Sequence, residues 1–237
     1  MLFVHEVHRV VGKHEDAFEA AYRDEWLPLL AKSDDARLLY FMHHAHGSGR
    51  AYVAVTITAV RDGAAYERLV ERVQTGDLRR WAAEVDGFRH EVAGKLLVQV
   101  PWSPWRDLDL DAVPTGAGDH PLTIFMEDTA WPHEAMLDDY LEAAHDHYAP
   151  SLEESRRGGR ALLELQAVFQ TAWGAAGRRR EVVLWQKIVE PQRITGLLTS
   201  EVPAEYRAPG TWMHDALRVR DDWESRLLRT SSWSPLY

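Results

Sequence analysis

The sequence predicts an α+β protein built from two tandem ferredoxin-like repeats, each with the element order βαββαβ. Three observations lead to this prediction. The second half repeats landmark residues of the first half in the same order, each half alternates strand-like and helix-like hydrophobic patterns, and a segment rich in Asp, Pro and Gly separates the halves. A chain of 237 residues with 46% apolar side chains is long enough to bury a core in each half.

The internal repeat is most visible at the ends of the two halves, which align without a gap. The aligned pairs are Trp81 with Trp212, Arg89 with Arg220, and the Trp-Ser-Pro sequences at 102–104 and 233–235. Nearer the start of each half the offset shrinks, and Trp26 and Pro28 fall on Tyr148 and Pro150. We therefore predict a first repeat at 1–104, a linker at 105–119 and a second repeat at 120–237.

The first repeat opens with residues 3–11, which alternate as a strand, and continues with 15–30, where apolar residues recur at helical spacing. The remaining expected elements are strands at 37–46 and 51–59 joined by a hairpin at 47–50, helices at 64–73 and 77–88, and a closing strand at 95–100. This order is that of a split βαβ unit.

The second repeat shows the same order. Its expected elements are strands at 122–128, 162–172, 181–189 and 226–231, a helix at 134–147, and helical pieces within 194–219. A ferredoxin-like sheet carries helices on one face, so the other face needs a cover. Two repeats supply that cover by packing sheet to sheet as an intramolecular α/β barrel. We expect any functional site in the central cavity.

Composition excludes several classes of function. The formal charge is -10 and the basic residues are scattered, which argues against nucleic acid as a partner. Since no apolar run approaches the ~20 residues of a membrane span and no signal sequence begins the chain, we expect no membrane partner and a cytoplasmic location. The absence of cysteine removes disulfides, thiolate metal sites and cysteine nucleophiles.

Several segments resemble the NIPSNAP-like proteins of the dimeric α/β barrel superfamily. They are the opening His5-Glu6-Val7-His8-Arg9 with Gly12-Lys13, the helix at 18–28, and the repeat ends 95–104 and 226–236. The resemblance covers both halves and implies this fold. It also implies the superfamily's range of activities, which includes cofactor-free monooxygenases, isomerases, cyclases, dehydratases and haem enzymes such as chlorite dismutases. The chain departs from the family at His5, where a tyrosine is usual, and at His8, where an arginine is common.

Candidate catalytic residues lie on the first strand. Glu6 and His8 share a face by the period-two alternation of strands, and we expect that face to line the barrel cavity. Tyr52 or Thr56 of the neighbouring strand could lie beside them. Further expected cavity residues on the second strand are Tyr40 and His44. In the second repeat they are Glu127, Gln166 or Gln170, and Trp185, and Glu127 is the residue that aligns with His8. For residues 184–188 the alternation leaves open whether Gln186 or the pair Trp185 and Lys187 faces inward.

A histidine and a carboxylate in an aromatic enclosure suit proton abstraction, because histidine titrates near neutrality and burial raises the pKa of a glutamate. We therefore expect an enzyme that performs acid/base chemistry on a small hydrophobic or aromatic molecule, as a monooxygenase, isomerase or lyase. His8 would transfer the proton, with Glu6 and Glu127 as carboxylates and Tyr40, His44, Tyr52, Gln170 and Trp185 binding substrate.

Three alternatives stay open. A buried structural hydrogen bond explains Glu6 with His8 equally simply. A transition metal held by His8, His44 and His46 is the second cofactor expectation, after cofactor-free chemistry, and haem is the third. A non-catalytic protein that binds a hydrophobic ligand is the rival class, and pairing into a homodimer is undecided.

Overall fold

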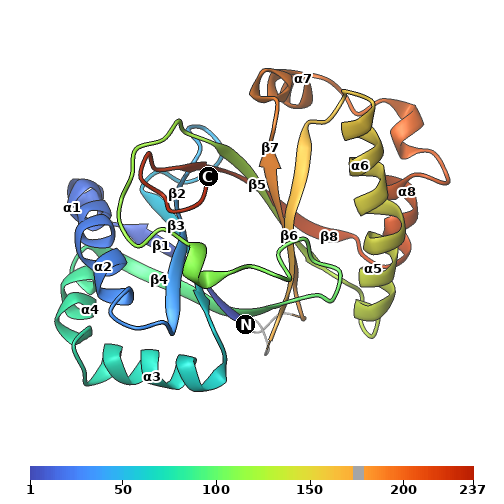
Figure 1. The fold of residues 1–237 in the computed structure, drawn as a ribbon. Coiled ribbons are helices and arrows are strands. Elements are labelled where there is room, and N and C mark those ends of the chain that lie inside the picture. Colours follow the sequence, from blue (N-terminus) through green and yellow to red (C-terminus); the bar gives the residue numbers. More distant parts are fainter. Residues whose placement is uncertain (173–178) are drawn as a thin grey trace. The chain divides into compact units, whose positions relative to one another are not determined.

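The computed structural model describes residues 1–172 and 179–237 and divides them into two compact units (Figure 1). The first unit comprises Met1–Gln99, Asp107–Thr123 and Leu227–Tyr237, and the second comprises Val100–Arg106 and Ile124–Arg226. Each unit thus holds the body of one predicted repeat together with the closing segment of the other. Among the described residues, no helix has the length and apolar character needed to cross a membrane.

The first unit has the predicted βαββαβ order. Its elements are β1 Leu2–Val10, α1 Glu15–Ala20, α2 Leu27–Leu30, β2 Ala36–His44, β3 Val53–Val60, α3 Gly63–Gln74, α4 Arg79–Asp86 and β4 Arg89–Gln99. The antiparallel sheet has the strand order β4-β1-β3-β2, and Glu6 on β1 lies opposite Thr56 on β3 and Gly94 on β4. β4 begins well before the predicted strand at 95–100, and this extension places Arg89 on the sheet.

The second unit repeats this plan. Its elements are β5 Ile124–Trp131, α5 Leu137–Ala143, α6 Ala149–Arg157, β6 Leu163–Thr171, β7 Val182–Ile188, α7 Ile194–Thr199, α8 Trp212–Asp215 and β8 Asp222–Thr230, whose last residues belong to the first unit. The strand order is β8-β5-β7-β6. The helix predicted to end at 147 continues to Arg157, with Pro150 near the start of α6.

The first helical region of each unit contains a π turn, at Ala21–Trp26 and at Ala144–Tyr148. The side chains that these regions bury are spaced by four residues, as Phe18, Tyr22 and Trp26 and as Tyr140, Ala144 and Tyr148. In a regular α-helix, residues eight apart point in directions that differ by about 80°. The wider π turn absorbs this drift, and all three side chains of each set are buried against the sheet of their unit.

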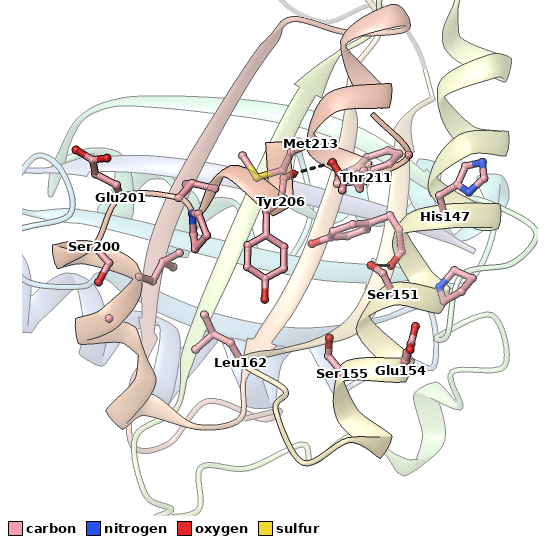
Figure 2. Close-up of a pocket in the computed structure, with 18 of the residues that line it drawn as sticks. His147, Ser151, Glu154, Ser155, Leu162, Ser200, Glu201, Tyr206, Thr211 and Met213 are labelled. Carbon is pink, nitrogen blue, oxygen red and sulfur yellow. Dashed lines mark hydrogen bonds between the residues drawn. The ribbon is translucent and has the colours of Figure 1, made fainter. Parts of the chain in front are cut away.

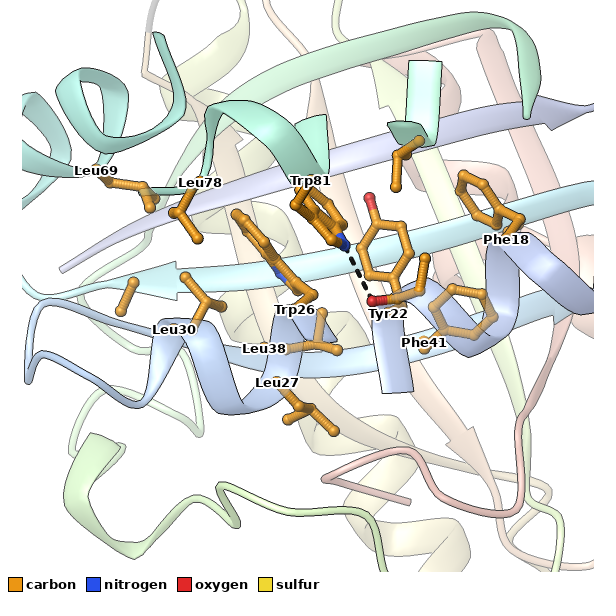
Figure 3. Close-up of a cluster of buried hydrophobic side chains, with 14 of the residues drawn as sticks. Phe18, Tyr22, Trp26, Leu27, Leu30, Leu38, Phe41, Leu69, Leu78 and Trp81 are labelled. Atoms are coloured by element: carbon orange, nitrogen blue, oxygen red, sulfur yellow. Dashed lines mark hydrogen bonds between the residues drawn. The ribbon is translucent and has the colours of Figure 1, made fainter. Parts of the chain in front are cut away.

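The helix-side core of the first unit is aromatic (Figure 3). Trp26 stacks on Trp81 with ring centroids 4.2 Å apart, and Tyr22 meets Trp81 edge-on at 5.1 Å. The Trp81 indole N–H donates a 3.0 Å hydrogen bond to the carbonyl of Ala21, the first residue of the π turn. In the second unit Tyr148 and Trp212 lie 5.2 Å apart, as the aligned sequence predicts.

The two Trp-Ser-Pro sequences make equivalent hydrogen bonds in the two units. The Ser234 hydroxyl accepts a 3.1 Å hydrogen bond from the backbone N–H of Phe41 on β2, and the Ser103 hydroxyl accepts a 3.0 Å bond from Val168 on β6. Three residues earlier, Ser231 donates its N–H to the Phe41 carbonyl and Val100 donates to the Val168 carbonyl, both at 3.1 Å. The duplication predicted from sequence is therefore present in the hydrogen bonds of the strand edges.

Replacing either serine with alanine leaves a buried strand N–H without its acceptor. We expect Ser103→Ala and Ser234→Ala each to lower the free energy of unfolding by about 1–3 kcal/mol, measured by urea denaturation. Ser232→Ala is the matched control, since Ser232 is an exposed neighbour of the same segment. Equal stability of all three variants would contradict the assigned role.

Glu19 on α1 connects the helix layer to the carboxyl-terminal segment through hydrogen bonds. Its Oε1 accepts a 2.6 Å hydrogen bond from the Trp233 indole, and its Oε2 lies 3.0 Å from His43 Nε2. Burial alone would raise the pKa of Glu19, but hydrogen bonds from His43, Ser231 and Trp233 outweigh it and lower the pKa to about 2. The ionised carboxylate therefore stabilises the folded state.

A carboxyl group whose pKa falls on folding contributes stability above its unfolded pKa, and that contribution is lost as pH falls from 4.5 towards about 2. Because the Glu19 side chain is 26% exposed, we expect the contribution to be about 1–2 kcal/mol after solvent screening. Glu19→Gln should lose less stability than the wild type on acidification across this range, in thermal unfolding experiments. Glu25→Gln, at an exposed position nearby, should follow the wild type.

Candidate active site

Glu6 and His8 share a face of β1, as predicted, but that face is covered by the helices of the first unit. The His8 ring packs against Phe18 and Tyr22, with centroid distances of 5.2 and 5.7 Å. The expectation that this face lines a cavity on the helix-free side of the sheet is therefore wrong. The two polar side chains find hydrogen-bonding partners on β3, on β4 and in the helix layer, which meets the requirement that buried polar groups be paired.

A hydrogen-bonded chain joins the polar residues beneath the helices. Arg89 Nη1 donates to His8 Nδ1 at 2.9 Å, and because a guanidinium only donates, the histidine proton resides on Nε2. Nε2 then donates to Thr56 Oγ1 at 3.0 Å, and the Thr56 hydroxyl hydrogen-bonds to Glu6. The expectation that Thr56 lies beside Glu6 and His8 is confirmed.

The electrostatics assign different protonation behaviour to the two residues. Burial, helped by the charge of Arg89, lowers the pKa of His8 to about 3, so its imidazole is neutral at physiological pH. Burial raises the pKa of Glu6, and the charge of Arg89 only partly opposes this. Burial also raises the pKa of Tyr22 well above 10, which keeps its phenol protonated. The expectation that His8 titrates near neutrality is wrong, and Glu6 is the better proton acceptor.

A cavity of about 270 Å³ lies beside this chain of groups. Its polar lining includes Glu6, Thr58 and Arg89. The aromatic wall is formed by Tyr22, Trp26 and Trp81, which Figure 3 shows side by side. Helix α3 lines the cavity with aliphatic side chains and with Tyr66 and Gln74. The arrangement combines a carboxylate of raised pKa, a guanidinium and flat apolar walls.

Other predicted site residues of the first unit lie elsewhere. Phe41 faces the helix core, so Tyr40 and His44, which alternate with it on β2, lie on the opposite face of the sheet from His8. The prediction that Tyr40 and His44 share the face of β2 that the helices do not cover is therefore correct. Tyr52 is 50% exposed at the start of β3, and its ring lies so close to Gly12 that a Cβ there would be 2.9 Å from it.

The structure does not bring the three predicted metal ligands together, although His44 and His46 line one pocket. His8 lies beneath the helices, His44 lies on the other face, and His46 is exposed beyond the end of β2. Within residues 1–172 and 179–237, no group of three or more His, Asp or Glu side chains is placed to hold a metal ion.

In the second unit, Glu127 lies on the face of the sheet that the helices do not cover. Gln186 faces the helices, where the Tyr148 hydroxyl donates to its amide oxygen and its nitrogen donates to Asp128 at 2.9 Å. Trp185 therefore faces the opposite side, with Phe125 at 5.6 Å and Glu127 as its register partner. This settles the orientation of residues 184–188. Glu127 is 1% exposed and lies 3.6 Å from Arg226.

Gln170 stands near the end of β6, where its amide oxygen lies 3.4 Å from Arg180 Nη2, on the face shared with helix-packed Val168 rather than with Trp185. Sequence reasoning missed the roles of Tyr22, Trp26, Trp81 and Arg89. For Trp26, Trp81 and Arg89 the available signal was recurrence in the repeat, where they align with Tyr148, Trp212 and Arg220. Tyr22 aligns with Ala144 and gave no such signal.

Comparisons with known proteins give structural likeness without a sequence match. No family model matches the chain, and no curated protein matches it. A crystal structure from Lactobacillus acidophilus NCFM, provisionally named a monooxygenase, covers 99% of this chain and 96% of its own at 9% identity and a TM-score of 0.58. An anthrone oxidase-like protein covers 97% of this chain and 91% of its own at 9% identity and a TM-score of 0.53.

An uncharacterized NIPSNAP domain protein from Burkholderia xenovorans also matches, at 20% identity over 44% of this chain and 99% of its own, with a TM-score of 0.37. The two likenesses over the whole chain confirm the predicted fold class. The chain has the predicted fold of two tandem ferredoxin-like repeats.

Proposed function

We propose that the cavity of the first unit is the active site of a monooxygenase that removes a proton from a small aromatic molecule and then lets O₂ oxidise the resulting carbanion. The observation that carries the proposal is the position of Glu6. Its carboxylate lines an aromatic cavity, and burial raises its pKa, so that it is a stronger base than an exposed carboxylate.

The walls of the cavity favour a flat, largely apolar substrate. The stacked rings of Trp26 and Trp81 and the edge-on ring of Tyr22 offer surfaces for an aromatic body. Arg89 lies at the polar end, where it holds His8 and Asp86 and keeps further N–H groups for a ligand oxygen. A phenol or ketone oxygen that becomes negative when the substrate loses a proton is stabilised by this guanidinium.

The reaction balances with O₂ as the co-reactant. Glu6 accepts a proton from an acidic C–H of the substrate, and the electron pair moves toward the oxygen near Arg89. The carbanion transfers electrons to O₂, one oxygen atom forms a bond to that carbon, and the other leaves as water with the two hydrogens lost from the carbon. Anthrone and O₂ would give anthraquinone and water by this route.

His8 is a positioning residue in this scheme. Its Nδ1 holds Arg89 and its Nε2–H holds Thr56, which in turn hydrogen-bonds to Glu6. The neutral ring thus fixes the guanidinium and the carboxylate relative to each other. The names of the two neighbours, a monooxygenase and an anthrone oxidase-like protein, favour oxygenation over other reactions that begin with proton removal.

Glu6→Gln should reduce kcat/KM for oxidation of anthrone by about 10²–10⁴-fold, because the amide cannot accept the proton. The assay measures oxygen uptake together with anthraquinone absorbance. In the wild type the rate should rise with pH through the raised pKa of Glu6, since the base must be ionised, and the variant should lose this acidic limb. Glu91→Gln, on the exposed part of β4, is the matched control.

A full rate in Glu6→Gln would overturn the assignment of the base. Exchange of the substrate C–H with deuterium in wild-type protein without oxygen uptake would overturn the oxygenation step and leave proton abstraction.

His8→Asn tests the positioning role separately. We expect kcat to fall about tenfold, which corresponds to about 1.4 kcal/mol, while the acidic limb of the pH profile stays, because Glu6 is still the base. Loss of that limb in His8→Asn, with a folded protein by circular dichroism, would show that His8 is the titrating group and contradict the neutral imidazole.

A further inference from the structure

A second pocket, of about 770 Å³, lies entirely within the second unit (Figure 2). One wall is helix α6, and the other is the segment at 196–213, which includes the end of α7 and the start of α8. The Thr211 hydroxyl donates a 2.7 Å hydrogen bond to the Tyr206 carbonyl, which ties this segment back on itself beside the pocket. The volume is in the range of small-molecule sites.

The interior of the pocket is aromatic and aliphatic. Tyr148 and Trp212 lie with their ring centroids 5.2 Å apart. Tyr206 points its ring toward Leu162 (Figure 2). Tyr148 is 9% exposed, and its hydroxyl is held by Gln186, so this side of the pocket is fixed by the core of the unit.

The charged lining of the pocket is acidic and comprises Asp146, Glu154 and Glu201, with His147 as a further titratable side chain. Asp146 pairs with His145, outside the pocket, at 2.7 Å. Glu154 on α6 and Glu201 beyond α7 stand on opposite walls in Figure 2. Neither carboxylate has a hydrogen bond or ion pair among the described residues, in contrast to Glu153, which pairs with Arg156 and Arg157 outside the pocket. No Lys or Arg is among the described residues that line it.

We infer that this pocket binds an organic cation, a protonated amine or quaternary ammonium on an apolar body. The faces of Tyr148, Tyr206 and Trp212 attract cations and bury apolar surface at once. Glu154 or Glu201 supplies the opposite charge, and both disfavour an anion of the same shape. The site is separate from the proposed active site in its unit and in its residues.

The test compares three probes that share one ring system. They are 2-(1-naphthyl)ethylamine, which is a cation at neutral pH, 2-(1-naphthyl)ethanol and 1-naphthaleneacetate. By isothermal titration of the whole chain at low salt, we expect the amine to bind at least about tenfold more tightly than the alcohol, the equivalent of about 1.4 kcal/mol, and the acetate to show no binding.

Variants locate the site. The double variant Glu154→Gln with Glu201→Gln should remove the preference for the amine, and Ser155→Trp, which fills the pocket from α6, should abolish binding of the amine. Glu205→Gln is the matched control, an exposed neighbour that does not line the pocket, and should bind as the wild type does. Glu6→Gln should also bind normally, which separates this site from the proposed active site.

Equal binding of amine and alcohol, unchanged preference in the double glutamine variant, or full binding in a folded Ser155→Trp protein would each overturn the inference. Absence of binding by all three probes would overturn it too.

Discussion

The π turn in the first helical region of each unit controls what the sheet beneath it can hold. It keeps Phe18, Tyr22 and Trp26 over the sheet, although their spacing would rotate them apart in a regular helix. The π turn also positions the Trp81 side chain. Its Ala21 carbonyl accepts a hydrogen bond from the Trp81 indole, and the Trp26 ring stacks on the face of the Trp81 ring. Glu19, on α1 just before the π turn, accepts a hydrogen bond from the Trp233 indole. The position of the aromatic wall is thus fixed from both sides.

Duplication gave both units this wall, but the polar groups beneath it differ. In the first unit Glu6 hydrogen-bonds within the cluster and still lines a cavity. In the second unit Asp128 accepts from Ser225 at 2.5 Å and from Gln186 at 2.9 Å, and neither Asp128 nor Gln186 lines the pocket beside α6. Burial raises the pKa of Asp128 as it does that of Glu6, yet a buried carboxylate without access to a cavity cannot meet a substrate.

Local pattern predicted the fold well, because period and order are properties of neighbouring residues. Alternation correctly grouped Glu6, His8 and Thr56 on one face. It could not identify which face the helices cover, since that depends on partners distant in sequence. The polarity of Glu6 and His8 predicted that their face lines an open cavity. His8 is instead buried under the helices, where Arg89, 81 residues further along the chain, donates a hydrogen bond to its ring.

The same limit applied to chemistry. A histidine seen in sequence has its ordinary pKa near neutrality, and only the structure shows that a guanidinium occupies its acceptor nitrogen. The residue that sequence reasoning treated as the base is therefore neutral, and the base role passes to its strand neighbour Glu6. The prediction at Tyr52 failed for a related reason. Alternation was extended to the residue before β3 begins at Val53, and there the backbone has a positive φ of 58°.

The aligned aromatic pairs connect the two proposals. Trp26 and Trp81 line the cavity of the first unit, and their counterparts Tyr148 and Trp212 line the pocket of the second. In the first unit the pair faces a glutamate and a guanidinium, a combination that favours a substrate whose negative charge develops during reaction. In the second unit the pair faces carboxylates, with no Lys or Arg among the described lining, which favours a ligand that is already cationic. The same aligned aromatic pair therefore suits a substrate that becomes negative in the first unit and a cationic ligand in the second. The charged residues beside the pair determine this difference.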